Sequence, residues 1–169
     1  MPVTRVALHD RPIDASALLR EVESHAAGAT VLFLGTVREH NVGRAVTGID
    51  YSAYQGMAER VLAAITHEAT TRFGALAVVA EHRLGFLALG ETSVAIAVAH
   101  ERRAGAYDAS RYVIEELKRR VPVWKREHYV DGTREWVDPT GSQGSDRAGN
   151  GSLARSAALY PQHSHGAPA

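Results

Sequence analysis

Apolar side chains recur with helical spacing in three segments of the chain. The first segment begins after Asp14, an effective helix N-cap, and Gly28 is expected to end it. The second covers residues 57–73. The third covers residues 107–121 and must stop before Pro122, which has no N–H to donate and clashes with the preceding turn. The pattern therefore predicts three helices.

Runs of alternating apolar or β-branched residues predict strands between these helices. The strands are expected at residues 3–8, 30–37, 45–54, 76–82 and 92–100, the second of them buried. Gly35 marks a bulge or a close backbone approach, and the polar segment 38–44 is expected to be a mobile loop. A last hairpin turns at Asp131-Gly132 before residues 134–137. This order indicates an α+β fold with an antiparallel or mixed sheet.

The chain changes character after its last predicted strand. Its 169 residues are 45% hydrophobic, which is enough for one core. We expect residues 1–138 to form a single domain. Residues 139–169 are rich in Gly, Ser, Ala and Pro and show no periodicity, so they are predicted to be a low-complexity, disordered tail.

Charge and cysteine content narrow the classes of function. Lys plus Arg and Asp plus Glu number 19 each, so no overall field favours nucleic acid or an anionic membrane. No apolar run approaches the roughly 18 residues of a membrane span, and the first five residues do not begin a signal peptide, so a cytoplasmic protein is expected. The absence of cysteine excludes thiolate chemistry on this chain, and the nine histidines lack the spacing of metal ligands. Neither a metal site nor a cofactor is predicted.

The third predicted helix carries a lysine among its apolar positions. With about 100° per residue and Ile114 at the centre, Lys118 falls inside the apolar stripe. The other members of that stripe are Tyr107, Ser110, Leu117 and Val121. Lys125 follows on an extended segment, so two lysines flank a helix-to-strand turn and indicate an anion site. The alternative is a solvated basic edge, since a lysine stem can cover apolar surface while its amine stays in water.

Basic residues also lie at the ends of other predicted elements. Arg38 follows one strand, the pair Arg102-Arg103 follows another, and Lys118 and Lys125 flank the turn. If these groups converge, they would bind one phosphorylated small molecule. A lysine partly removed from water and flanked by cations has a lowered pKa and can act as acid, base or nucleophile. The alternative is that the arginines are independent surface residues.

Five segments of the sequence match one known family in the correct order. They are FLGTVREHNVG (33–43), the segment from Tyr51 to Ala58, His82-Arg83-Leu84-Gly85, Gly90-Glu91 and LKRRVPVWKRE (117–127). Over about residues 3–139 the chain resembles the catalytic, large subunit of molybdopterin synthase. The resemblance implies an α/β hammerhead-like fold with added strands, including the C-terminal hairpin.

The resemblance also implies a sulfurtransferase of molybdenum-cofactor biosynthesis that converts cyclic pyranopterin monophosphate to molybdopterin. In that family the sulfur arrives as a C-terminal Gly-Gly thiocarboxylate on a small ubiquitin-like subunit, in agreement with the absence of cysteine here. Two large subunits form a homodimer with a small subunit at each far end, a heterotetramer. The alternative is a non-catalytic α+β module that binds a phosphorylated small molecule or a partner protein through the same basic pocket.

Individual residues carry over by their place in the motifs. Lys118 and Lys125 match the two essential lysines and are the expected catalytic residues, with Lys118 assigned the chemistry and Lys125 the substrate's charge. The expected substrate-binding residues are Thr36, Val37, Arg38, Arg102, Arg103, Arg126 and Glu127. Arg102 stands where the family has a histidine, and His100, two residues earlier, is the alternative for that role.

Overall fold

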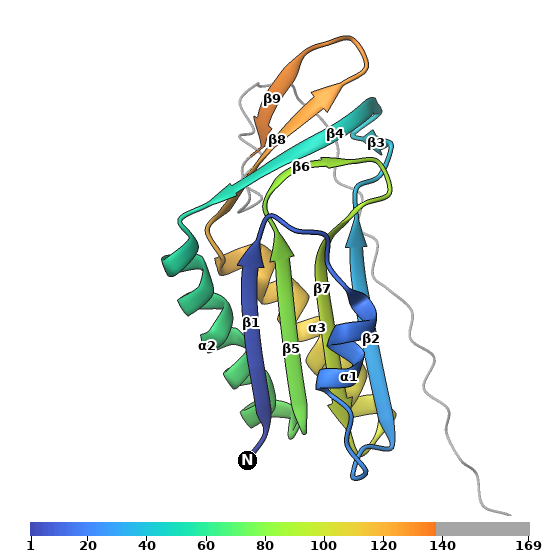
Figure 1. Ribbon diagram of the computed structural model, residues 1–169, viewed down its shortest axis with the longest axis vertical. Coiled ribbons are helices and arrows are strands. Elements are labelled where there is room, and N and C mark those ends of the chain that lie inside the picture. The colour runs from blue at the N-terminus through green and yellow to red at the C-terminus, as the bar shows by residue number, and fades with distance from the viewer. Residues whose placement is uncertain (138–169) are drawn as a thin grey trace, which may run out of the picture.

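The computed structural model describes residues 1–137. These residues form three helices and two β-sheets, and the two sheets stand end to end (Figure 1). In chain order the elements are β1 (Val3–His9), α1 (Ala15–Glu21), β2 (Ala29–Thr36), β3 (His40–Asn41), β4 (Arg44–Ala53), α2 (Gln55–Phe73), β5 (Ala77–Arg83), β6 (Gly85–Ala88), β7 (Thr92–His100), α3 (Arg103–Arg120), β8 (Val123–Tyr129) and β9 (Arg134–Val137). The predicted tail 139–169 lies outside the described residues. Within residues 1–137 no helix is both long and apolar enough to span a membrane.

The first sheet has the strand order β1-β5-β7-β2. β1 pairs parallel with β5, and the other two pairs are antiparallel, so the predicted α+β fold with a mixed sheet is confirmed. The expectation that β2 is buried was wrong. β2 is an edge strand whose residues are all half-buried or exposed, whereas β5 and β7 fill the centre. At Gly35 the predicted irregularity is confirmed by a register shift in the β2–β7 pair.

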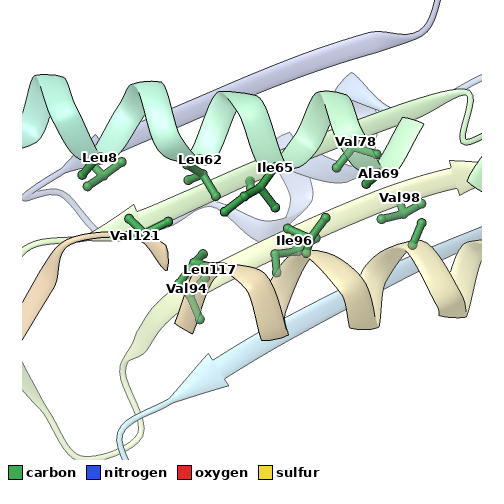
Figure 2. Close-up of a cluster of buried hydrophobic side chains, with 14 of the residues drawn as sticks. Leu8, Leu62, Ile65, Ala69, Val78, Val94, Ile96, Val98, Leu117 and Val121 are labelled. Carbon is green, nitrogen blue, oxygen red and sulfur yellow. The ribbon is translucent and has the colours of Figure 1, made fainter. Parts of the chain in front are cut away.

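Helices cover both faces of this sheet (Figure 1). α2 and α3 pack on one face, and Figure 2 shows the aliphatic core between them and the strands. The labelled members of that core are Leu8, Leu62, Ile65, Ala69, Val78, Val94, Ile96, Val98, Leu117 and Val121. α1 covers the other face with Leu18 and Val22, and Asp14 is its N-cap as predicted. α1 ends at Glu21, not at Gly28, whose N–H instead donates to the His100 carbonyl.

The second sheet stands beyond one end of the first and has the order β3-β4-β8-β9, with β6 also on β4 (Figure 1). Residues 38–44 contain a tight hairpin where a mobile loop was predicted: β3 pairs with β4, and Val42 and Gly43 occupy the turn at φ 48° and 75°. The predicted hairpin at Asp131-Gly132 is confirmed by the pairing of β8 with β9.

The buried side of α3 differs from the predicted stripe. Its buried residues are Ala106, Ala109, Ser110, Val113 and Leu117. The stripe is therefore centred near Val113, not Ile114, because the helix packs its alanines against the sheet. Tyr107 and Lys118 are exposed, so the prediction that they lie inside the apolar stripe was wrong. Lys118 instead lies outside the buried face, on the last turn of α3.

Candidate active site

The two sheets meet where the end of β5 approaches β4, the strand that pairs with β8. Tyr51 on β4 lies directly opposite Lys125 on β8 in the antiparallel register. The Tyr51 ring also meets the His82 ring edge-on, with ring centroids 5.1 Å apart. His82 is the penultimate residue of β5. One tyrosine thus links a lysine of the second sheet to the end of the first, and this junction is the candidate active site.

Lys118 reaches the junction from the last turn of α3. Arg120 fixes that turn to α2 through an ion pair with Glu68 over 2.6 Å. Lys118 is an exposed residue and pairs with no carboxylate in the described structure, so the removal of water from its amine is only partial. That partial burial, and then the charges of Lys125 and Arg38, lower the pKa of Lys118. Both cations therefore disfavour the charged form of this amine.

Lys125 and Arg38 are joined by a chain of hydrogen bonds. Lys125 Nζ donates to Glu127 Oε1 over 3.2 Å. The Asn41 amide donates to both oxygens of the same carboxylate, over 2.7 and 2.9 Å. Arg38 in turn donates to Asn41 Oδ1 over 3.4 Å. The hairpin that carries Asn41 is therefore what brings Arg38 to the lysines.

Glu127 is the anchor of this chain. Its side chain is 1% exposed, and it also accepts a hydrogen bond from the Tyr129 hydroxyl over 2.7 Å. Burial alone would raise the pKa of Glu127, but the hydrogen bonds from Asn41 and Tyr129, with the charge of Lys125, lower it overall. The carboxylate thus stays ionised and its acceptor capacity is used by protein groups. In this structure Glu127 holds Lys125 and Asn41 in place.

His82 contributes a neutral ring beside these cations. It is 5% exposed, and burial lowers the pKa of His82 to about 4, with a smaller contribution from the charge of Lys118. The Arg83 carbonyl, 2.9 Å from His82 Nδ1, opposes that shift. At neutral pH the junction therefore holds an uncharged imidazole beside its basic side chains.

Arg126 lies on the other face of β8, because side chains alternate along a strand. Its guanidinium donates to Asp50 Oδ2 over 3.0 Å and lies 5.3 Å from the centre of the Trp136 ring. The same face carries a cavity of about 420 Å³ lined by Ser52, Ala53, Tyr54, Trp124 and Trp136. The structure does not bring Arg126 together with the lysines.

Thr36 and Val37 lead into Arg38 in different ways. Thr36 is an exposed residue at the end of β2. The Val37 side chain is 3% exposed inside a small cluster with Val46 and Leu87. Both backbone groups of Val37 are bonded as well, its N–H to Glu91 and its carbonyl to Gly90. Val37 therefore fixes the start of the Arg38 segment.

Arg102 and Arg103 lie at the opposite end of α3 from Lys118. The helix has 18 residues, and at 1.5 Å per residue its length is about 27 Å. Within one chain these two arginines are not brought to the junction. His100 is also committed there: its Nε2 is 2.8 Å from the Phe73 carbonyl, and its Nδ1 accepts the Arg102 N–H over 2.8 Å. In this chain His100 links the backbones of two segments.

Comparisons with known proteins agree on one family. The family model described as MoaE protein matches residues 8–120. A molybdopterin synthase catalytic subunit from Synechococcus elongatus is 44% identical over 134 residues, covering 79% of this chain and 81% of that protein. One from Bacillus subtilis is 38% identical over 133 residues, covering 79% and 84%. The crystal structure of molybdopterin synthase from Staphylococcus aureus superposes with a TM-score of 0.74 at 34% identity, covering 78% of this chain and 96% of that one.

The chain belongs to the MoaE family. Its curated relatives are catalytic subunits of molybdopterin synthase, an enzyme of molybdenum-cofactor biosynthesis. The recognition made from the sequence motifs is therefore confirmed. Four of the five motifs contribute residues to the junction, and the fifth, Gly90-Glu91, binds the backbone of Val37 beside Arg38.

Three residues of the candidate site were missed by reasoning from the sequence: Asn41, Tyr51 and His82. Each lies inside a motif that was used for the resemblance. The prediction of site residues concentrated on Lys and Arg, and none of these three is a Lys or an Arg. Asn41 was assigned to a mobile loop. The signal that could have found it is the Asn-Val-Gly turn after it, which favours a tight hairpin.

Proposed function

We propose that this chain is the catalytic subunit of a molybdopterin synthase, which converts cyclic pyranopterin monophosphate to molybdopterin by adding two sulfurs as a dithiolene. The observation that carries the proposal is the convergence of Arg38, Lys118 and Lys125 at the junction of the two sheets. Three cations around one site suit a phosphorylated substrate. Membership of the MoaE family supports the reaction.

The two lysines have different electrostatic surroundings and therefore different proposed roles. Lys125 is paired with a buried carboxylate, so it remains a fixed positive charge that, with Arg38, holds the substrate's phosphate. Lys118 has a lowered pKa and no acidic partner in the described part of the chain. It is the amine that exchanges a proton, or attacks a carbonyl, most readily near neutral pH. Val37 and Glu127 act by positioning Arg38 and Lys125.

The proposed sulfur donor is the C-terminal Gly-Gly thiocarboxylate of a small ubiquitin-like subunit. The chain has no cysteine, so another molecule must bring the sulfur. The name "catalytic subunit" of the relatives supports an enzyme with a further subunit. A cytoplasmic location is part of the proposal.

The proposed homodimer gives Arg102 and Arg103 a role that a single chain cannot. The length of α3 keeps them about 23 Å from Lys118 of their own chain, along the helix axis. If they bind substrate, they must do so at the site of a second copy. Arg126, which faces away from the lysines, is proposed to bind at the rim of the site, through contacts made on assembly.

Reconstitution tests the proposed function. The chain, cyclic pyranopterin monophosphate and a thiocarboxylated small subunit are incubated, and molybdopterin is measured by fluorescence after oxidation. Product is expected only when all three are present. Binding of the substrate without any product would instead favour the non-catalytic module.

A single variant tests the assignment of the chemistry. Lys118→Ala is expected to lose product formation by at least about a hundredfold, the range of a missing acid, base or nucleophile. Its thermal unfolding should match that of the wild type, because Lys118 is exposed. Full activity of Lys118→Ala would remove Lys118 from the mechanism.

A further inference from the structure

His82 is a buried titratable residue for which the proposed function has no use. Successive side chains of a strand point to opposite faces of the sheet, so Val78, Ala80 and His82 of β5 share one face. Val78 and Ala80 belong to the core under α2 and α3, so His82 points to that side as well. The Cα partner of His82 on β7 is Val94, which lies in the same core cluster as Leu117 of α3. The imidazole therefore lies on the α2–α3 side of the sheet, one strand away from Val94, which Figure 2 shows next to Leu117 on the last turns of α3.

The hydrogen bond of His82 fixes which ring nitrogen can accept a proton. Nδ1 is 2.9 Å from the Arg83 carbonyl, which can only accept, so Nδ1 carries the hydrogen. Burial keeps the ring neutral, and Nε2 is then an acceptor with a free lone pair. Nε2 has no partner among the described residues and is not sealed from solvent. It is open to a donor arriving from the junction.

The charged groups that face Lys118 come from every element packed around it. Arg38 follows β2, and Lys125 and Glu127 lie on β8. Glu127 already accepts from Asn41, Tyr129 and Lys125. The charge of Lys118 is felt at His82, so the two groups are neighbours. His82 Nε2 is thus an acceptor on which the charge of Lys118 acts and to which no described residue donates.

We propose that His82 is a positioning residue for Lys118: its Nε2 accepts a hydrogen bond from the Lys118 amine and directs that amine at the substrate. A lysine side chain has four rotatable bonds, so a fixed acceptor removes much of the disorder that would otherwise have to be lost in the transition state. The identity of the reaction rests on the proposed function, whereas the hydrogen bond does not.

Two substitutions separate the two ring nitrogens of His82. The amide oxygen of glutamine can stand where Nε2 stands, so His82→Gln keeps an acceptor for Lys118. The amide of asparagine reaches only as far as Nδ1, so His82→Asn keeps the donor to the Arg83 carbonyl and removes that acceptor. In the assembled enzyme, His82→Asn is expected to lower kcat by about tenfold, the factor for one ordinary hydrogen bond, with KM changed less than about threefold. His82→Gln is expected to retain most of kcat.

A second measurement needs no turnover. Lys118 and Lys125 are the chain's two lysines, so protein labelled with ¹³C-lysine gives two side-chain signals, which Lys125→Arg assigns. Because a neutral acceptor stabilises the ammonium, His82→Asn is expected to lower the pKa of Lys118 relative to wild type, and His82→Gln is expected to leave it near the wild-type value.

Each outcome decides the proposal. The proposal is supported if His82→Asn lowers both the pKa of Lys118 and kcat, and if His82→Gln keeps both near their wild-type values. Equal losses in both variants with a lowered unfolding temperature would mean that His82 only packs, and an unchanged Lys118 titration in His82→Asn would also overturn the proposal. If wild type makes no molybdopterin, the proposed function fails, but the lysine titration still tests the hydrogen bond.

Discussion

Lys125 donates a hydrogen bond to the buried carboxylate of Glu127 over 3.2 Å. The pair holds the side chain of one of the two site lysines in place. The other, Lys118, is surrounded by positive charge and lacks such a partner in the described structure, so it holds its proton less tightly. The difference in pairing leads directly to tests that treat the two lysines differently.

Arginine substitutions should separate the two lysines. Arginine keeps the positive charge but does not lose its proton in proteins. Lys118→Arg is therefore expected to lower kcat by about a hundredfold or more, as expected for loss of a proton-transferring or nucleophilic group. Lys125→Arg should lose less, within about tenfold, because the charge toward Glu127 and the phosphate remains. Equal losses in steady-state assays of the two variants would contradict the division of roles.

The pH dependence of the reaction should follow Lys118. If the neutral amine is the reactive form, kcat/KM should rise with pH to a plateau, with a midpoint below the usual lysine value of 10.5. Removing the neighbouring charge in Lys125→Met relieves repulsion of the Lys118 ammonium and raises its pKa, so the midpoint should move to higher pH. The pH–rate profiles of both proteins check this. A midpoint that moves to lower pH, or not at all, would contradict the coupling.

Glu127→Gln should destabilise the second sheet. The amide presents N–H groups to donors such as Asn41 and Tyr129, so buried groups lose partners, at a cost of about 1–3 kcal/mol in the free energy of unfolding. Denaturant unfolding measures it. The matched control is Glu135→Gln, because Glu135 lies directly opposite Glu127 on β9 but is exposed, and it should change stability less. Equal effects would mean that burial of Glu127 is not what matters.

Gly35→Ala should disturb the approach to Arg38. A Cβ at residue 35 would lie 2.6 Å from Val94 Cγ1, and crowding of this kind typically costs about 1–3 kcal/mol. We expect lower stability together with a raised KM, since the shifted strand carries Arg38. Gly56→Ala is the control: it lies near the start of α2 with open space around it and should be neutral or slightly stabilising. An unchanged KM in Gly35→Ala would show that a disturbance of β2 does not change how Arg38 binds the substrate.

The sequence predicted the elements well where local patterns decide them. Asp14 caps α1, and the Asp131-Gly132 turn forms its hairpin, because caps and tight turns depend on neighbouring residues alone. Gly28 was misassigned because its role is a long-range contact with His100, which no local pattern reveals. The sheet order, with β4 pairing with β8 in a second sheet, likewise depends on contacts between distant segments.

The candidate site was predicted in part, and the reasons differ from residue to residue. The meeting of Arg38 with the two lysines agrees with the expectation of a cationic pocket. The place of Lys118 on its helix was wrong, because the alanines of α3 pack against the sheet and shift the buried face. Arg126 was grouped with Lys125 although consecutive residues of a strand face opposite sides.

The confinement of lysine to the site has a practical consequence for anyone who handles this protein. All 17 other basic side chains counted with them are arginines, since Lys and Arg total 19. Apart from the terminal amine, reagents directed at amines, such as biotin esters, cross-linkers and activated sensor chips, have only Lys118 and Lys125 to react with. Coupling through amines would therefore block the proposed site, whereas loss of labelling in the presence of an anionic compound would report directly that the compound occupies it.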